Sequence, residues 1–298
     1  MKALSVSLMP TYLCNYHCSY CYLGDLTKDK TCLDISLLKA RLSELSCHYE
    51  ISGIDIFGGE ISLLKNDYLD ELFKTCRQFT KSIAVTSNLT RLSFLSLIDK
   101  YNIKLTVSVN IERDYFLKTI NTIKQLKSEY SILSVVLPSI LSCNVKDLLD
   151  FYESLHPSSV TFIEYYPARR ARINYSITNQ AYSDFLKQVI DLRKNYSYSI
   201  GNLQDLNYLC SHNYIDNVFI TPYGNFASTQ YDNEGLEYFV EHDTLNDWLN
   251  NSNKCKTYQT ECLTCQYKHK CLAEHIKPHS KDDECAGHPS LIKYIDLL

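Results

Sequence analysis

No stretch of this 298-residue chain is apolar over the roughly 20 residues that a membrane-spanning helix needs. Neither sign of charge dominates, because 30 lysines and arginines oppose 34 aspartates and glutamates and leave a net charge of −4. A basic surface for nucleic acid or anionic membrane is therefore not expected. Residues 1–13 contain one lysine and a short mixed apolar stretch, which favours a first β-strand over a signal peptide. We expect a cytoplasmic protein with neither nucleic acid nor membrane as a partner.

Internal repeats and low-complexity segments are also lacking. Hydrophobic residues make up 45% and charged residues 21% of the chain, as is usual for a globular protein. The length suffices for one large α/β domain with a smaller appendage, or for two ordinary domains.

Strand and helix patterns alternate about six times over the first 165 residues, which indicates a parallel sheet with crossover helices, either open or a partial barrel. A single linking helix is expected at residues 180–196, and a β-hairpin at residues 218–228 that turns at 222–225. The expected strands cover residues 3–8, 53–57, 82–86, 105–109, 132–137 and 160–164, and the expected helices cover residues 34–47, 66–79, a stretch from about 91, 113–128 and 145–155.

Thirteen cysteines are many for this length, and they gather towards the two ends of the chain. Their odd number, their short spacings and the lack of a secretion signal favour metal ligation over disulfides. Cys14, Cys18 and Cys21 follow the first expected strand with the spacing C-x3-C-x2-C. Three thiolates can ligate three irons of a cubane cluster and leave the fourth iron open. A zinc ion would need a fourth ligand, and only His17 is near.

Polar or glycine residues follow three more of the expected strands. They are the Gly58-Gly59-Glu60 segment, Ser87-Asn88 and Ser108-Val109-Asn110. Because ligands of parallel sheets lie at the carboxyl ends of the strands, these segments and the cysteines should meet at one mouth. Glycines let a backbone approach closely, and a carboxylate accepts hydrogen bonds from an ammonium group. A Gly-Gly turn before a helix and ordinary capping at strand ends are the alternatives.

The first cysteine run resembles the C-x3-C-x-aromatic-C signature of the radical S-adenosylmethionine (SAM) enzymes, with Tyr20 in the aromatic position. The Gly58-Gly59-Glu60 segment resembles the GGE motif of that family, although Ile61 follows it where proline is common. The resemblance implies a partial (β/α)6 TIM-like barrel over residues 1–175. It also implies a 4Fe–4S cluster whose open iron chelates SAM. The GGE segment would then hold the SAM amino group, and the SAM ribose or carboxylate would be contacted by Asn88, Ser108 and Asn110.

A second cysteine group lies near the C-terminus, and taken alone it could bind zinc or an iron–sulfur cluster. Behind a radical SAM domain it resembles the SPASM extension, and it consists of Cys262, Cys265, Cys271 and Cys285. The resemblance implies that these four hold one auxiliary 4Fe–4S cluster. The positions that a further cluster would need hold Thr229 and His275, so one auxiliary cluster is predicted; a rescued second one would have to use Cys210, Cys255 and His275. Residues 176–204 would form a linking helix, and residues 205–298 a reduced SPASM-like domain that contains the hairpin.

Most relatives with this extension modify peptides, so the resemblance implies a maturase that oxidatively modifies a ribosomally made precursor peptide. A crosslink is the expected product, in the form of a cyclophane-type carbon–carbon or carbon–heteroatom bond. The expected partners are the precursor peptide, an electron donor such as flavodoxin or ferredoxin, and either a separate leader-peptide-binding protein or recognition by the barrel. The alternatives are a radical SAM epimerase or dehydrogenase acting on a sugar or amino acid, and a non-catalytic cluster-binding protein.

Three arginines, Arg169, Arg170 and Arg172, follow the sixth expected strand. They could clamp a carboxylate of SAM or of a peptide. A solvated basic turn is the alternative. No titratable residue outside the cluster and SAM motifs stands out as catalytic.

Overall fold

One sheet of ten strands organises the protein. The structure is a computed structural model that describes residues 1–203, 216–252, 262, 264–267 and 280–298. The strand order is β10-β9-β8-β1-β2-β3-β4-β5-β6-β7. The strands are β1 (Lys2–Leu8), β2 (Tyr49–Ile56), β3 (Ile83–Ser87), β4 (Lys104–Ser108), β5 (Ser131–Val136), β6 (Ser159–Glu164), β7 (Ser199–Ile200), β8 (Asp216–Ile220), β9 (Phe226–Tyr231) and β10 (Glu237–His242).

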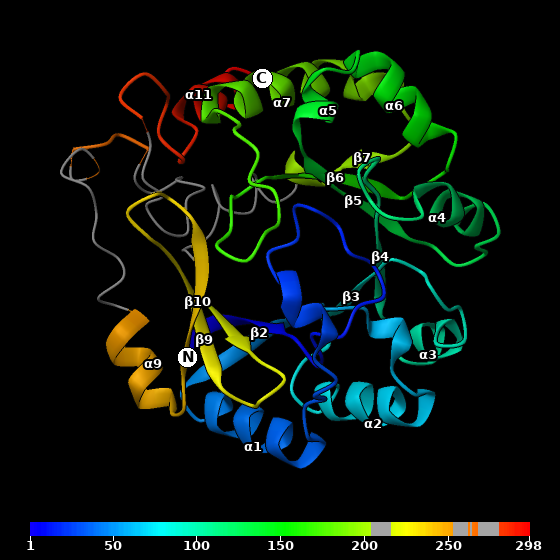
Figure 1. Cartoon of the computed structure of the whole chain (residues 1–298), viewed down its shortest axis with the longest axis vertical. Coiled ribbons are helices and arrows are strands. Elements are labelled where there is room, and N and C mark those ends of the chain that lie inside the picture. The colour runs from blue at the N-terminus through cyan, green and yellow to red at the C-terminus, as the bar shows by residue number, and fades with distance from the viewer. Residues whose placement is uncertain (204–215, 253–261, 263, 268–279) are drawn as a thin grey trace.

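Strands β1 to β6 pair in the order of the sequence, and every pair is parallel. The connecting helices form an outer ring around the curved sheet (Figure 1). This arrangement confirms the expected α/β fold of the partial TIM-barrel type, with a sheet that does not close among the described residues. The described α-helices are α1 (Ile35–Ser46), α2 (Asn66–Cys76), α3 (Leu95–Lys100), α4 (Phe116–Ile123), α5 (Pro138–Leu141), α6 (Val145–Glu153), α7 (Asn179–Leu192), α9 (Leu245–Ser252) and α11 (Pro289–Ile295).

Local sequence explains where the helices begin. Asp34 caps α1, because its Oδ1 accepts a hydrogen bond from the backbone N of Leu37 at 2.9 Å. Helix α4 is shorter than the expected 113–128, since it begins only after Tyr115, whose backbone is left-handed with φ 58°. Arg113 therefore lies in the loop after β4 and not in a helix. No helix in the described ranges has the length and apolar character needed to cross a membrane.

The expected hairpin is formed by β8 and β9, which are antiparallel, and β10 extends it. Strand β8 runs parallel to β1, so the hairpin continues the sheet of the barrel. The guanidinium of Arg41 on α1 fastens it by donating to the backbone oxygens of Gly224 and Asp243, each at 2.8 Å. The division of the chain near residues 175 and 204 stays a prediction.

A short contact joins the loop after β6 to β10. Ala168 and Glu237 form an isolated parallel bridge, in which the N of Glu237 donates to the O of Pro167 at 2.7 Å. Arg169 strengthens this contact, since its Nε donates to Asp232 Oδ2 at 2.7 Å and its guanidinium lies 3.7 Å from the ring centroid of Tyr238. All three arginines are exposed, and these two contacts give Arg169 a structural role.

Candidate active site

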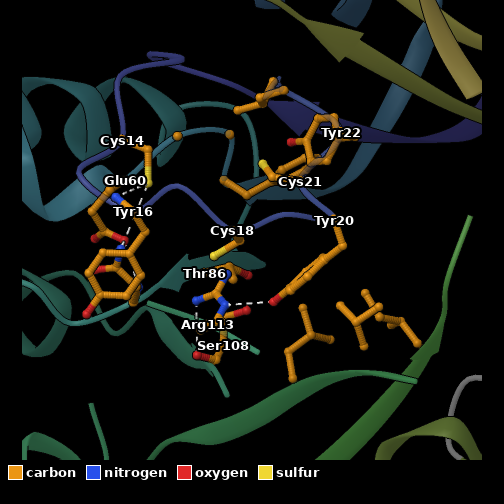
Figure 2. A pocket seen from close by; sticks show the side chains of 18 of the residues that line it. Cys14, Tyr16, Cys18, Tyr20, Cys21, Tyr22, Glu60, Thr86, Ser108 and Arg113 are labelled. Carbon is orange, nitrogen blue, oxygen red and sulfur yellow. Dashed lines mark hydrogen bonds between the residues drawn. The ribbon is translucent and has the colours of Figure 1, made fainter. Parts of the chain in front are cut away.

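Cys14, Cys18 and Cys21 lie on the loop that follows β1, and all three line one pocket of about 400 Å³ (Figure 2). The backbone N of Cys14 donates to the O of Thr27 at 3.0 Å, and this bond joins the first part of the loop to the part near Thr27. Burial raises the pKa of the Cys14 thiol to about 11, and it also raises the pKa of the Cys21 thiol. These thiols therefore stay protonated at neutral pH until a bound metal displaces the proton.

The arrangement of these cysteines bears on which metal group they can hold. Among the described residues, no three His, Cys, Asp or Glu side chains are placed to hold one metal ion. A zinc ion draws all its ligands to about 2.0–2.3 Å from one centre. A 4Fe–4S cluster instead takes each thiolate on a different iron, so its ligands stand further apart. That the three cysteines around the pocket hold a 4Fe–4S cluster with one open iron stays a prediction.

The glycine pair after β2 packs against the stem of the cysteine loop. The N of Gly59 donates to the O of Thr11 at 2.9 Å, and the N of Glu60 donates to the O of Leu13 at 2.7 Å. A Cβ on Gly59 would lie 2.2 Å from the O of Leu13, and Gly58 has a φ of 119°. Glycine is therefore required at both positions, because any side chain would push the cysteine loop away.

The carboxylate of Glu60 is only 1% exposed, and it accepts hydrogen bonds from the turn that follows it and from the end of β3. Its Oε1 accepts from Ser87 Oγ at 2.6 Å and from the N of Ser62 at 2.9 Å. Its Oε2 accepts from the N of Asn88 at 2.7 Å. Glu60 thus fixes the end of β3 next to the cysteine loop. A contact of this segment with the amino group of SAM stays a prediction.

The structure brings most of the other predicted contacts to the same pocket. Tyr20, Asn88 and Ser108 line it together with the glycine pair and Glu60. Asn110 is not among the described residues that line it. Its Nδ2 donates to the O of Val135 at 2.7 Å, and its Oδ1 accepts from the N of Val135 at 2.9 Å. Asn110 therefore joins the end of β4 to β5 through the backbone of Val135, which itself lines the pocket.

Arg113 lines the pocket although the sequence motifs did not point to it. Its Nε donates to the hydroxyl of Tyr20 at 3.1 Å, and one terminal nitrogen donates to the O of Ser108 at 3.1 Å. Figure 2 shows its guanidinium beside the sulfur of Cys18. No ion pair joins it to a carboxylate within the described part of the chain. A partly buried cation in this position suits an anionic ligand. The only signal in the sequence was a lone arginine five residues beyond β4.

A second carboxylate reaches the pocket from the end of β6. Glu164 lines it together with Tyr166, whose hydroxyl donates to Glu164 Oε2 at 2.9 Å. The same oxygen lies 2.8 Å from Nε2 of His288, a residue near the C-terminus that is 2% exposed. On the other side of the ring, His288 Nδ1 lies 2.9 Å from Ser183 Oγ and 3.6 Å from Glu284 Oε1. Sequence reasoning missed this group, because 124 residues separate Glu164 from His288.

The ring of His288 is held between two carboxylates. Burial by itself would lower its pKa, but the hydrogen bonds to Glu164 and Glu284 outweigh burial and raise it to about 9. Burial likewise acts to raise the pKa of Glu284, and the hydrogen bonds from His288 and Ser183 instead bring it down to about 2. At neutral pH the imidazolium therefore ties α7 and the C-terminal segment to the end of β6.

This tie predicts a pH-dependent stability. Because the folded pKa of His288 lies above its unfolded value of about 6.5, its contribution is complete below pH 6.5 and is lost as the pH rises through 9. We expect the loss to be on the order of 2 kcal/mol. Thermal unfolding of the anaerobic protein should show a larger fall in Tm from pH 6.5 to 9 for wild type than for His288→Gln. Equal falls in the two proteins would contradict this account.

Three of the four predicted auxiliary ligands lie in the described part of the chain. Burial raises the pKa of the Cys285 thiol, and the thiols of Cys265 and Cys262 are close enough to raise it further. The three thiols thus lie close enough together to interact electrostatically, and a cluster that they share with Cys271 stays a prediction. Cys271 lies outside the described residues, and so do Cys210, Cys255 and His275. Thr229, which stands where a further cluster would need cysteine, is buried in β9.

No protein-family model and no curated protein matches the chain. Solved structures do match. The structure of anSMEcpe with bound AdoMet (SAM) has a TM-score of 0.71 and 16% identity, covering 98% of this chain and 95% of that one. Native anSMEcpe with AdoMet and the Cp18Cys peptide has a TM-score of 0.70 and 17% identity, and the match again covers 98% of this chain and 95% of that one. Streptococcus suis SuiB bound to precursor peptide SuiA has a TM-score of 0.63 and 16% identity, and the match covers 91% of this chain and 71% of that one.

The chain has the same fold as these structures. In this fold the cysteine loop, the glycine pair, the ends of β3 and β4, and the loop after β6 all contribute to one pocket. That pocket lies at the carboxyl ends of the parallel strands, where α/β proteins bind their ligands. It is therefore the candidate active site.

Proposed function

We propose that this protein is a radical SAM enzyme that modifies a ribosomally made peptide. The observation that carries the proposal is the single pocket that holds Cys14, Cys18 and Cys21 beside the glycine pair and Arg113. Three thiols, a close-packed backbone segment and a partly buried cation are what a cluster with an open iron and a zwitterionic amino-acid ligand need.

The residues of the pocket then have separate tasks. Cys14, Cys18 and Cys21 would hold a 4Fe–4S cluster. When bound, that cluster supplies an open iron and the electron that cleaves SAM into methionine and a 5′-deoxyadenosyl radical. Arg113 would pair with the carboxylate of SAM, while the segment after β2 would hold its amino group. Asn88 and Ser108 would contact the ribose or the carboxylate.

The pocket wall also protects a reactive radical. Apolar side chains, among them Leu133, Val135 and Ile163, complete the lining near Glu164. Such a wall excludes water and holds the target C–H bond near the radical, which would otherwise be quenched.

A peptide substrate is supported by two of the similar structures, which contain the Cp18Cys peptide and the precursor peptide SuiA. We propose an oxidative crosslink in the peptide as the product, of the cyclophane type, with loss of two hydrogens. One auxiliary cluster on Cys262, Cys265, Cys271 and Cys285 would accept the second electron. A flavodoxin or ferredoxin would deliver the first electron, and either a separate protein or the barrel itself would bind the leader.

Co-expression with a short peptide encoded beside the gene tests this function. Mass spectrometry should show a peptide lighter by two hydrogens, because a crosslink removes one hydrogen from each partner atom. An unchanged mass with deuterium uptake from heavy water would indicate epimerisation instead. An unmodified peptide, together with SAM cleavage that responds only to sugars or free amino acids, would contradict the peptide proposal.

A further inference from the structure

The turn after β3 has a strained backbone at the edge of the pocket. Leu89 adopts a left-handed conformation with φ 57°, which costs energy for any residue with a side chain. The strain is held in place, because the side chain of Leu89 is 2% exposed and its N donates to Ser87 Oγ at 2.9 Å. Residues 87–90 therefore have one fixed shape.

This shape aims the side-chain amide of Asn88, which is 4% exposed. The N of Thr90 donates to Asn88 Oδ1 at 3.0 Å, so the oxygen of the amide is identified by its partner. The opposite end, Nδ2, can only donate, and it lies 4.0 Å from the sulfur of Cys14. The backbone N of Tyr16 donates to the same sulfur at 3.4 Å. Cys14 thus has two N–H groups directed at it.

Two further bonds keep the turn beside the cysteine loop. The N of Asn88 donates to Glu60 Oε2 at 2.7 Å. The hydroxyl of Thr90 lies 2.5 Å from Oδ1 of Asn88 and 3.1 Å from Oδ1 of Asn15, the residue next to Cys14, so its one proton is shared between these two acceptors. The turn is therefore fixed both to the segment after β2 and to the cysteine loop, so the distance from Asn88 to Cys14 is set by the fold.

We propose that Asn88 donates a hydrogen bond to the Cys14 sulfur and thereby raises the reduction potential of the cluster on Cys14, Cys18 and Cys21. The inference rests on the proposed function, since it requires that cluster. Reduction adds negative charge to the cluster and its thiolates. An N–H dipole directed at a ligand sulfur stabilises the reduced state more than the oxidised state. Asn88 therefore makes the electron needed for SAM cleavage easier to load, whether or not it also touches SAM.

The test is a potentiometric titration of the anaerobically reconstituted full chain, followed by electron paramagnetic resonance and carried out without SAM. The signal of this cluster is identified afterwards as the one that changes when SAM is added. We expect Asn88→Ala to lower the ratio of reduced to oxidised cluster about tenfold at a fixed potential, which is a shift of about 59 mV for one electron. Asn88→Asp should shift the midpoint further negative, because it replaces the donor by a carboxylate.

Asn110→Ala is the matched control. It removes the same buried amide at the end of the neighbouring strand, where the partner is the backbone of Val135. Its midpoint should equal that of wild type. Equal midpoints for wild type and Asn88→Ala, with the cluster assembled in both, would overturn the inference alone. Equal shifts in both variants would overturn it as well, because loosening of the loops would explain them. A wild-type chain that assembles no cluster sensitive to SAM would overturn the proposed function itself.

Discussion

Replacing Cys18 by alanine should abolish the formation of 5′-deoxyadenosine from SAM, with a loss of at least about a thousand-fold. Cys18 is the middle cysteine of the loop; its side chain is buried and lines the pocket. Without its thiolate, one iron loses its protein ligand and the cluster should not be retained. Iron should fall from about eight atoms per chain, for two 4Fe–4S clusters, to about four.

An exposed cysteine outside both groups provides the control for this experiment. Cys143 lies at the surface, and its thiol donates to the backbone O of Ser139 at 3.1 Å. Cys143→Ala should keep both the iron content and the SAM cleavage of wild type. SAM cleavage that survives in Cys18→Ala would contradict the assignment of the pocket. About twelve irons in wild type would contradict the prediction of a single auxiliary cluster.

Arg113→Leu should weaken the binding of SAM by about 100-fold, because removal of a charged hydrogen-bond partner from a buried site costs about 3 kcal/mol. The guanidinium lies in the pocket beside Cys18 and has no carboxylate partner among the described residues. Its loss should therefore remove the partner of the SAM carboxylate without leaving a buried anion unpaired. The Kd for SAM, measured on cluster-loaded protein by equilibrium dialysis, provides the comparison with wild type.

Arg172→Leu is the matched control, because Arg172 is exposed and was one of the three arginines that the sequence offered for a carboxylate clamp. We expect wild-type affinity for this variant. Arg113→Lys should recover part of the affinity, since it keeps the charge but not the planar fork. If Arg172→Leu weakened SAM binding and Arg113→Leu did not, the roles of the two arginines would be reversed.

The order of the parallel strands was predictable because each crossover helix carries its own local signals. Asp34 marks the start of α1, and Leu38, Leu42 and Leu45 mark its buried face. Strand ends were predictable for the same reason, and a parallel sheet gathers them at one edge. Strand β10 and helix α11 were not predicted from the sequence, because both depend on contacts with distant segments. The late start of α4 was not predicted, because it follows from the left-handed backbone of Tyr115.

The sequence by itself determined the cysteine loop, the glycine pair and their place at the ends of neighbouring strands, since spacing along the chain and the geometry of a parallel sheet suffice for these. Only the tertiary structure decided how the surrounding side chains are used. It turned the amide of Asn110 to β5 and that of Asn88 to Cys14, although both follow strand ends. It also brought Arg113 to the pocket and His288 to Glu164. Such pairings depend on backbone conformation and on contacts between residues that lie 25, 74 and 124 positions apart in the chain, which no local pattern encodes.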